Sequence, residues 1–177
     1  MDAKRLIEWL WVPPLSAPRA TILIRSMAGA VFLWEGILKF VYMNQGVGRF
    51  TKLGFPLPGL TAHFVGVLEI VGGILLIAGL RTRPTAIPFA IEMVVAMLST
   101  KIALYLGTSP LPLPPVPPQI GIWAVLHEVR SEYAQLMSVL FLLAAGPGPW
   151  SVDALIDRAR VRVRAVVPAP RRKPTAA

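Results

Sequence analysis

Four stretches of the sequence are long and apolar enough to cross a lipid bilayer as helices. A helix needs about 20 mostly apolar residues to span the hydrocarbon core. The windows that qualify lie at about 20–41, 60–80, 85–106 and 125–145. The last window opens on charged residues and is the least hydropathic, but Gly146-Pro147-Gly148-Pro149 ends it sharply. The pattern predicts an all-α integral membrane protein, a four-helix bundle.

Basic residues next to the spans predict the orientation, because Lys and Arg accumulate on the cytoplasmic side. Arg49 and Lys52 lie in the loops of one side, with Arg130 at the rim of the fourth span. The loops and tail of the other side carry twelve basic residues: Lys4, Arg5, Arg19, Arg81, Arg83, Arg158, Arg160, Arg162, Arg164, Arg171, Arg172 and Lys173. We therefore expect both termini in the cytoplasm and a multi-pass protein of the bacterial inner membrane.

The remaining segments divide the chain into three parts: an interfacial N-terminal segment at 1–19, a membrane domain at 20–149, and an amphipathic helix with a basic tail at 150–177. No small-residue cleavage site follows the first apolar patch, so we expect no removable signal peptide. Ser151 is a predicted N-cap. The helix after it should lie on the inner leaflet, with one apolar face made of Val152, Leu155, Ile156, Ala159 and Val163. The proline-rich loop at 109–118 should be a stiff, extended connector.

Composition excludes several classes of function. Apolar residues make up 55% of the chain and charged residues 15%, against about 25% charged in soluble domains. The net charge of +9 is concentrated in the tail, which indicates contact with anionic lipid rather than with nucleic acid. There is no cysteine and there are two histidines, His63 and His127, so we predict no thiol chemistry, haem or metal site.

Charged residues inside the spans are the candidates for chemistry. Each costs about 2.5–3.5 kcal/mol at the centre of a membrane helix, so such residues face the bundle interior and find partners there. Arg25 and Glu92 fall at similar depth toward the cytoplasmic side, and we expect them to form a structural ion pair. Glu35 and Lys39 have the spacing and order of an intrahelical pair.

Glu69 lies near the middle of the second span on a face of small residues, Gly66, Gly72 and Gly73, which favours contact with another helix. Lys101, Glu128 and Glu132 fall toward the same outer half of the bundle. Two interpretations stay open. The network specifies helix packing, or it lines a pocket for a quinone-like amphipathic ligand or proton relay, formed by Glu35, Lys39, Glu69, Lys101, Glu128 and Glu132. We assign no catalytic residue.

Several motifs together resemble the DoxX family of small bacterial membrane proteins. They occur in order over residues 20–155: Arg25, Phe32, Gly36, Lys39 and Phe40, then Leu53-Gly54-Phe55-Pro56, Glu69-Ile70-Val71-Gly72-Gly73, Gly79-Leu80-Arg81-Thr82-Arg83, and Gly146-Pro147-Gly148-Pro149-Trp150. The resemblance implies a four-helix membrane fold and an association with redox chemistry, in which Arg25, Lys39 and Glu69 match the polar motif. Related DoxD proteins are membrane subunits of a thiosulfate:quinone oxidoreductase, and other relatives are similar to assembly factors.

The leading hypothesis is a quinone-linked membrane subunit or anchor of an oxidoreductase complex, rather than an enzyme acting alone. In it Glu69 relays a proton and Lys39 stabilises an oxyanion. The alternatives are a non-enzymatic scaffold or assembly chaperone, and a small proton-coupled transporter. Membrane lipid is an expected partner, and a homo-oligomer is compatible with the pattern.

Overall fold

The computed structural model describes residues 2–11 and 15–166, and all regular structure in these residues is helical. The elements in chain order are α1 (Ala3–Trp11), α2 (Thr21–Val41), α3 (Val47–Lys52), α4 (Pro58–Ala78), α5 (Thr82–Ala96), the π-helix η1 (Met97–Lys101), α6 (Ala103–Leu106), α7 (Ile122–Glu128), α8 (Arg130–Ala145) and α9 (Val152–Val166). The all-α class is therefore confirmed.

Three helical segments of the described residues are long and apolar enough to cross a membrane: Thr21–Val41, Pro58–Ala78 and Thr82–Leu106. They agree with the first three predicted spans to within a few residues. The fourth predicted span corresponds to two helices, α7 and α8, which meet at Val129. The charged run His127–Glu132 lies at this junction. α8 has 16 residues, fewer than the about 20 needed to span the hydrocarbon core.

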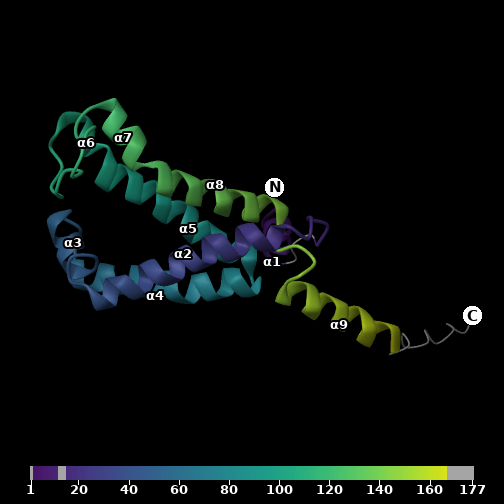
Figure 1. The fold of residues 1–177 in the computed structure, drawn as a ribbon. Helices are drawn as coiled ribbons and strands as arrows, with labels where there is room; N and C mark the ends of the chain where they lie inside the picture. Colours follow the sequence, from purple (N-terminus) through teal and green to yellow (C-terminus); the bar gives the residue numbers. More distant parts are fainter. Residues whose placement is uncertain (1, 12–14, 167–177) are drawn as a thin grey trace, which may run out of the picture.

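The long helices pack as two pairs, α2 with α4 and α5 with α8. The pairs meet near α1 and diverge toward α3, α6 and α7 (Figure 1). We call the end where the pairs meet the closed end, and the end where they diverge the open end. Between them, Phe32 of α2 stacks on Phe89 of α5 with ring centroids 3.7 Å apart. Leu76, Val139 and Leu142 complete this core, with no exposed surface, so the two pairs are held together along their closed halves only.

Glycines allow α2 and α4 to approach closely. A Cβ atom at Gly29 would lie 2.7 Å from the carbonyl oxygen of Gly73, and one at Gly36 would lie 2.8 Å from that of Gly66. Both distances are too short for a side chain, so only glycine fits this helix crossing. The predicted small-residue face around Glu69 is confirmed as a packing face, and the close approach brings Glu69 directly beside α2.

Replacing Gly73 with alanine should destabilise the protein by about 1–3 kcal/mol, because the added methyl group overpacks the crossing. It would lie 2.6 Å from the carbonyl oxygen of Gly29. Gly59→Ala, in the first turn of the same helix, is the matched control, since a Cβ atom there has no neighbour within 4 Å. Thermal unfolding in detergent measures both variants. Equal melting temperatures would contradict the proposed contact.

Two buried arginines join the elements at the closed end. The Arg25 guanidinium donates hydrogen bonds to the carbonyl oxygens of Ile77 (3.2 Å), Pro147 (2.6 Å) and Trp150 (2.6 Å). Arg83 donates to those of Leu143 (2.8 Å), Ala144 (2.9 Å) and Trp9 (2.8 Å). Except for that of Trp150, which lies in the segment before α9, these are carbonyls at or just past the C-terminal ends of helices, where the last carbonyls lack partners within their own helix. The arginines thus tie the ends of α1, α4 and α8 to α2 and α5.

The predicted ion pair between Arg25 and Glu92 is wrong. Arg25 is occupied by three carbonyl groups at the closed end, whereas Glu92 lies farther along α5, in the wall of a cavity. The positions of the two residues along their spans predicted a similar depth in the membrane. These positions could not show that the helix ends would supply enough acceptors to satisfy the guanidinium without a carboxylate.

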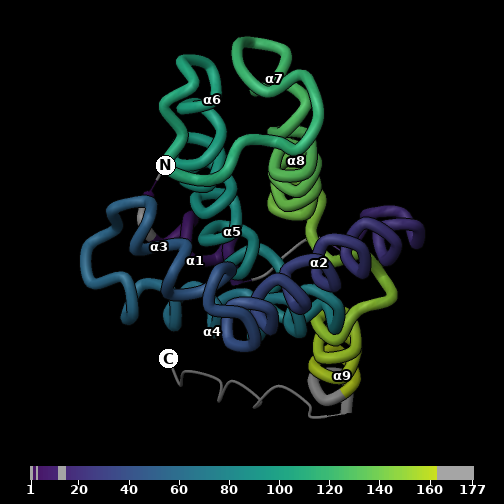
Figure 2. The backbone as a smooth tube through the Cα atoms, turned by 60° about the vertical axis from the view of Figure 1, so that its left-hand side comes forward, coloured from purple at the N-terminus to yellow at the C-terminus, as the bar shows by residue number. Residues whose placement is uncertain are grey.

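The segments at the open end are short and irregular. α3 lies across the end of the α2–α4 pair, while α6 and α7 lie side by side beyond α5 and α8 (Figure 2). The proline-rich segment 109–118 connects α6 to α7 without a helix. At the opposite end Ser151 accepts a hydrogen bond from the Ala154 amide, which confirms it as the N-cap of α9. Leu155 and Ile156 of this helix are exposed, and the side chain of Val163 lies outside the described residues.

Candidate functional site

A cavity of about 450 Å³ lies between the two helix pairs on the open side of the aromatic stack. We call it the central cavity. Its walls come from α2, α3, α4, α5, η1 and α8, and most of the lining is apolar, including Val31, Phe50, Val65, Leu68 and Met93. Phe64, Ile91 and Val95 line it and are also exposed on the surface of α4 and α5. The cavity is therefore reached from the side, between these two helices.

An ion pair lies in the cavity wall between α2 and α4. The Lys39 ammonium lies 2.8 Å from Glu69 Oε1 and 2.6 Å from Oε2. The Glu69 side chain is 4% exposed and that of Lys39 is 13% exposed. Glycine packing places Glu69 against α2. Because a buried carboxylate is costly without a partner, Lys39 of α2 pairs with it. The predicted intrahelical pair of Glu35 and Lys39 is wrong, because Lys39 turns across to Glu69 and Glu35 has no ion-pair partner among the described residues.

Glu92 of α5 also lines the central cavity. Its Oε2 atom is buried and has no hydrogen-bond partner in the structure. A buried oxygen of this kind is costly unless a proton, water or ligand satisfies it. The carboxyl group of Glu92 therefore has unused hydrogen-bonding capacity in the cavity wall.

The backbone of the α5–η1 segment is irregular where it lines the cavity. Pro88 lies inside α5 and cannot donate an amide hydrogen bond. The π-helical turn Met97–Lys101 follows it, and π-turns are frequent at functional sites. Ser99 and Thr100 donate their hydroxyl groups to the Val95 and Ala96 carbonyl oxygens at 2.7 and 2.6 Å. These bonds help to satisfy carbonyls of the widened turn beside the cavity.

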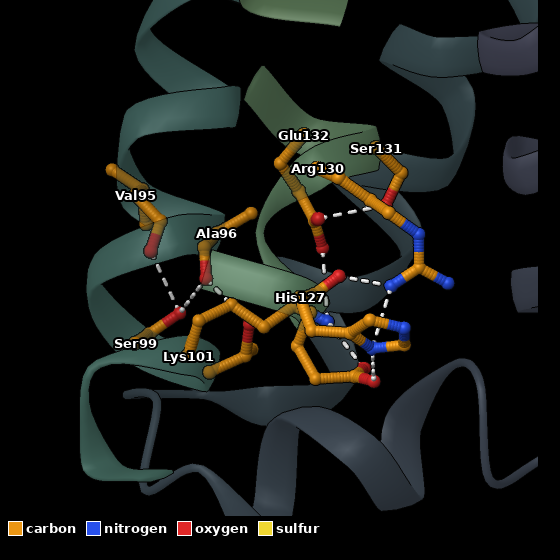
Figure 3. Close-up of polar contacts among 10 residues, drawn as sticks. Val95, Ala96, Ser99, Lys101, His127, Arg130, Ser131 and Glu132 are labelled. Carbon is orange, nitrogen blue, oxygen red and sulfur yellow. Dashed lines mark hydrogen bonds and ion pairs between the residues drawn. The ribbon is translucent and has the colours of Figure 1, made fainter. Parts of the chain in front are cut away.

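A second charged cluster lies nearer the open end. Lys101 Nζ is 3.2 Å from a carboxylate oxygen of Glu132 and 3.8 Å from one of Glu128. The Arg130 guanidinium donates to Nδ1 of His127 at 2.9 Å and also to the His127 carbonyl oxygen. Figure 3 shows these contacts together with those of Ser99. Glu132 of this cluster lines the central cavity, as does Ser131, whose hydroxyl group donates to the Glu132 carboxylate at 2.8 Å.

The structure thus brings together four of the six predicted ligand-site residues, Glu35, Lys39, Glu69 and Glu132, around one cavity. Lys101 and Glu128 instead line a separate space at the open end. The two histidines lie apart from the cavity on the surface, and His63 Nδ1 is 2.6 Å from the Gly59 carbonyl oxygen of its own helix.

Sequence reasoning missed two residues of this arrangement. Gln135 is 6% exposed, lines the cavity and donates to the Ala28 carbonyl oxygen at 3.3 Å. Gln135 is the side-chain amide in a mostly apolar stretch of α8, and this feature of the sequence could have identified it as a buried polar residue. Arg83 was counted only as a loop charge, although it is 3% exposed and its guanidinium lies 4.1 Å from the centre of the Trp9 ring. Nothing in the local sequence distinguishes it from Arg81, which is exposed.

Comparisons with known proteins identify relatives of this chain. The DoxX family model matches residues 20–102, from the start of α2 through η1. The "Uncharacterized membrane protein Rv3486" of Mycobacterium tuberculosis is 39% identical over 157 residues, which cover 85% of this chain and 90% of that protein. The "Putative oxidoreductase CatD" of Bacillus subtilis is 31% identical over 90 residues, 50% of this chain and 66% of that protein.

No solved structure matches the chain. The matched region contains the first two apolar spans, most of the third, both glycine-packed helices and the Lys39–Glu69 pair. Together with the similarity over nearly the whole length of the mycobacterial relative, it shows that this integral membrane protein belongs to the DoxX family.

Proposed function

We propose that this protein is a membrane subunit or anchor of an oxidoreductase system and that its central cavity binds a quinone-like amphipathic ligand. The observation that carries the proposal is a mostly apolar cavity of about 450 Å³ with an ion pair and an unsatisfied carboxyl group in its wall. Small-molecule sites commonly have volumes of about 300–1,000 Å³, apolar walls and a few polar groups that orient the ligand. The name of the Bacillus relative also contains the word oxidoreductase.

In this proposal the protein crosses the inner membrane four times, with both termini in the cytoplasm. The fourth crossing is made by α7 and α8 together, residues 122–145, which would extend about 36 Å at 1.5 Å per residue. The closed end with Arg25, Arg83 and α9 then faces the cytoplasm, and the open end faces the opposite side. The exposed mouth between α4 and α5 lies within the bilayer, where an isoprenoid ligand is dissolved.

The polar groups of the cavity suit a quinone head group. Its carbonyl oxygens accept hydrogen bonds, which the Lys39 ammonium and a protonated Glu92 can donate. Reduction of a quinone to a quinol takes up two electrons and two protons. A partner oxidoreductase subunit supplies the electrons in this proposal, while Glu69 and Glu92 hold protons beside the ligand. This role explains why two acidic groups lie together in an apolar site, which packing alone does not require.

The proposal predicts that protein purified in mild detergent retains isoprenoid quinone at close to one molecule per chain. Lys39→Met and Glu92→Leu should each lower retention at least tenfold, because each removes a hydrogen-bonding group from the head-group site. Ala96→Phe should do the same without changing any charge, because it fills part of the cavity that Ala96 lines. Extraction followed by chromatography and mass spectrometry measures the quinone.

Lys4→Gln serves as the control, because Lys4 is exposed on α1 and far from the cavity. Melting temperatures are recorded for every variant, so that loss of ligand can be separated from loss of fold. Wild-type protein that carries no quinone and gains no thermal stability when quinone is added would overturn the proposal. The polar network would then be a packing device, as expected for a scaffold or assembly factor.

A further inference from the structure

A second cavity lies at the open end, outside the central one. Its volume is about 400 Å³, and it lies between α3, the last turn of the π-helix and the proline-rich segment 109–118. We call it the end cavity. Unlike the central cavity, it is lined by a high proportion of polar side chains, including Asn44, Gln45, Arg49, Lys52 and Lys101. Gln45, Arg49 and Thr100 line both cavities, so the two spaces adjoin.

The charge of the end cavity is unbalanced. Among the described residues, Glu128 is the one carboxylate that lines it, and Glu128 shares Lys101 with Glu132. Arg49 and Lys52 have no carboxylate within 4 Å among the residues that the structure describes. They are three residues apart on α3 and face the same cavity. Like charges at this spacing repel each other, and they are therefore best accommodated by an anion placed between them.

The proline-rich segment forms a stiff wall opposite these cations. Residues 111–115 line the cavity, and three of them are prolines, which have no amide hydrogen to donate. The segment is held in shape by the Gln119 side chain, which donates to the Pro114 carbonyl oxygen at 2.8 Å, and by the Leu111 amide, which donates to Ser109 Oγ at 3.2 Å. Most hydrogen-bond donors for a ligand therefore come from the α3 side, from Asn44, Gln45, Arg49 and Lys52.

We propose that the end cavity binds an oxyanion of the phosphate type, with Arg49 and Lys52 as its main ligands. Guanidinium and ammonium groups recognise such groups through charge-assisted hydrogen bonds, and Arg49 can offer two donors at once. The oxyanion is either a free anion from the aqueous side or the headgroup of an anionic phospholipid in the adjacent leaflet. The site does not depend on a quinone in the central cavity, because Lys52 and Asn44 line only the end cavity.

The test uses full-length, delipidated protein in neutral detergent and two probes. Inorganic phosphate is titrated by isothermal calorimetry at low ionic strength. Phosphatidylglycerol, compared with phosphatidylcholine, is added in nanodiscs and scored by native mass spectrometry. Arg49→Gln and Lys52→Gln are the site variants, and Lys4→Gln is the control of equal charge change on exposed α1. Because Lys52 is exposed and the Arg49 side chain forms no ion pair with any residue that the structure describes, both variants should fold.

Saturable phosphate binding that weakens about tenfold or more in both site variants, and not in Lys4→Gln, supports the site and identifies a free anion as its occupant. Retention of phosphatidylglycerol over phosphatidylcholine that both site variants lose supports the same chemistry with a lipid headgroup as its source. Equal binding of both probes by all three variants, or no binding by the wild type, overturns the proposal. Lys52→Gln should leave quinone retention unchanged, so the two proposals fail independently.

Discussion

Arg25→Met should lower the free energy of unfolding by about 3–5 kcal/mol. The guanidinium is 2% exposed and donates to three carbonyl oxygens, those of Ile77, Pro147 and Trp150. Each buried carbonyl left without a donor costs about 1–3 kcal/mol. Methionine fills similar space but donates nothing, so the ends of α4 and α8 lose their common tether. Thermal or denaturant-induced unfolding in detergent measures the effect.

Two further variants make this result specific. Arg25→Lys keeps the charge, but an ammonium cannot reach three acceptors with the geometry of the guanidinium fork, so an intermediate loss is expected. Arg158→Met should change stability by less than about 0.5 kcal/mol, because Arg158 lies on exposed α9 and makes one surface hydrogen bond, to Pro149. If the Arg25→Met and Arg158→Met variants had the same melting temperature, Arg25 would not be the tether described above.

Breaking the Lys39–Glu69 pair from either side should cost about 3 kcal/mol or more, because the remaining charge stays in an apolar environment without its partner. The two groups lie 2.6–2.8 Å apart with side chains 13% and 4% exposed. The double variant Lys39→Met/Glu69→Leu should lose much less than the sum of the single losses, since no buried charge remains. A double-mutant cycle measured by unfolding in detergent gives the coupling energy, which we expect to exceed 1 kcal/mol.

Glu35→Gln is the matched control for this pair. Glu35 lies on the same helix, one turn before Lys39, and lines the same cavity, but it has no ion-pair partner among the described residues. Its replacement should be nearly neutral or slightly stabilising. A loss equal to that of Lys39→Met would falsify the assignment of Glu69 as the partner of Lys39 and would restore the intrahelical pair suggested by spacing.

Lys39 pairs with Glu69 instead of the predicted Glu35, and this difference illustrates what residue spacing can and cannot predict. The i, i+4 spacing of Glu35 and Lys39 correctly placed both side chains on one side of α2, and both line the cavity. The choice between Glu35 and Glu69 depended on how close α4 comes. That distance is set by the Gly36–Gly66 contact, in which the backbones nearly touch. A buried carboxylate at such a contact attracts the ammonium more strongly than a half-buried one on the same helix.

The depth of charged residues along the spans was likewise not enough to predict which of them pair. The predicted depth in the membrane was similar for Arg25 and Glu92, but in the structure the two side chains lie in different places and have different partners. Arg25 ties helix ends together, while Glu92 faces the cavity with one oxygen unsatisfied. Rotation about the helix axis decides this outcome, and a single sequence specifies rotation only where a face is clearly small or apolar, as around Glu69.

The sequence by itself determined the helical membrane class, the first three spans, the packing face of α4 and the general level of the polar groups. These features depend on local hydrophobicity, glycine content and the cost of charge in a bilayer, all of which are readable residue by residue. The tertiary structure alone decided which charges pair, that α7 and α8 are separate helices, and that the two helix pairs diverge into a cavity. These features depend on interhelical distance and rotation, which arise only when the helices pack.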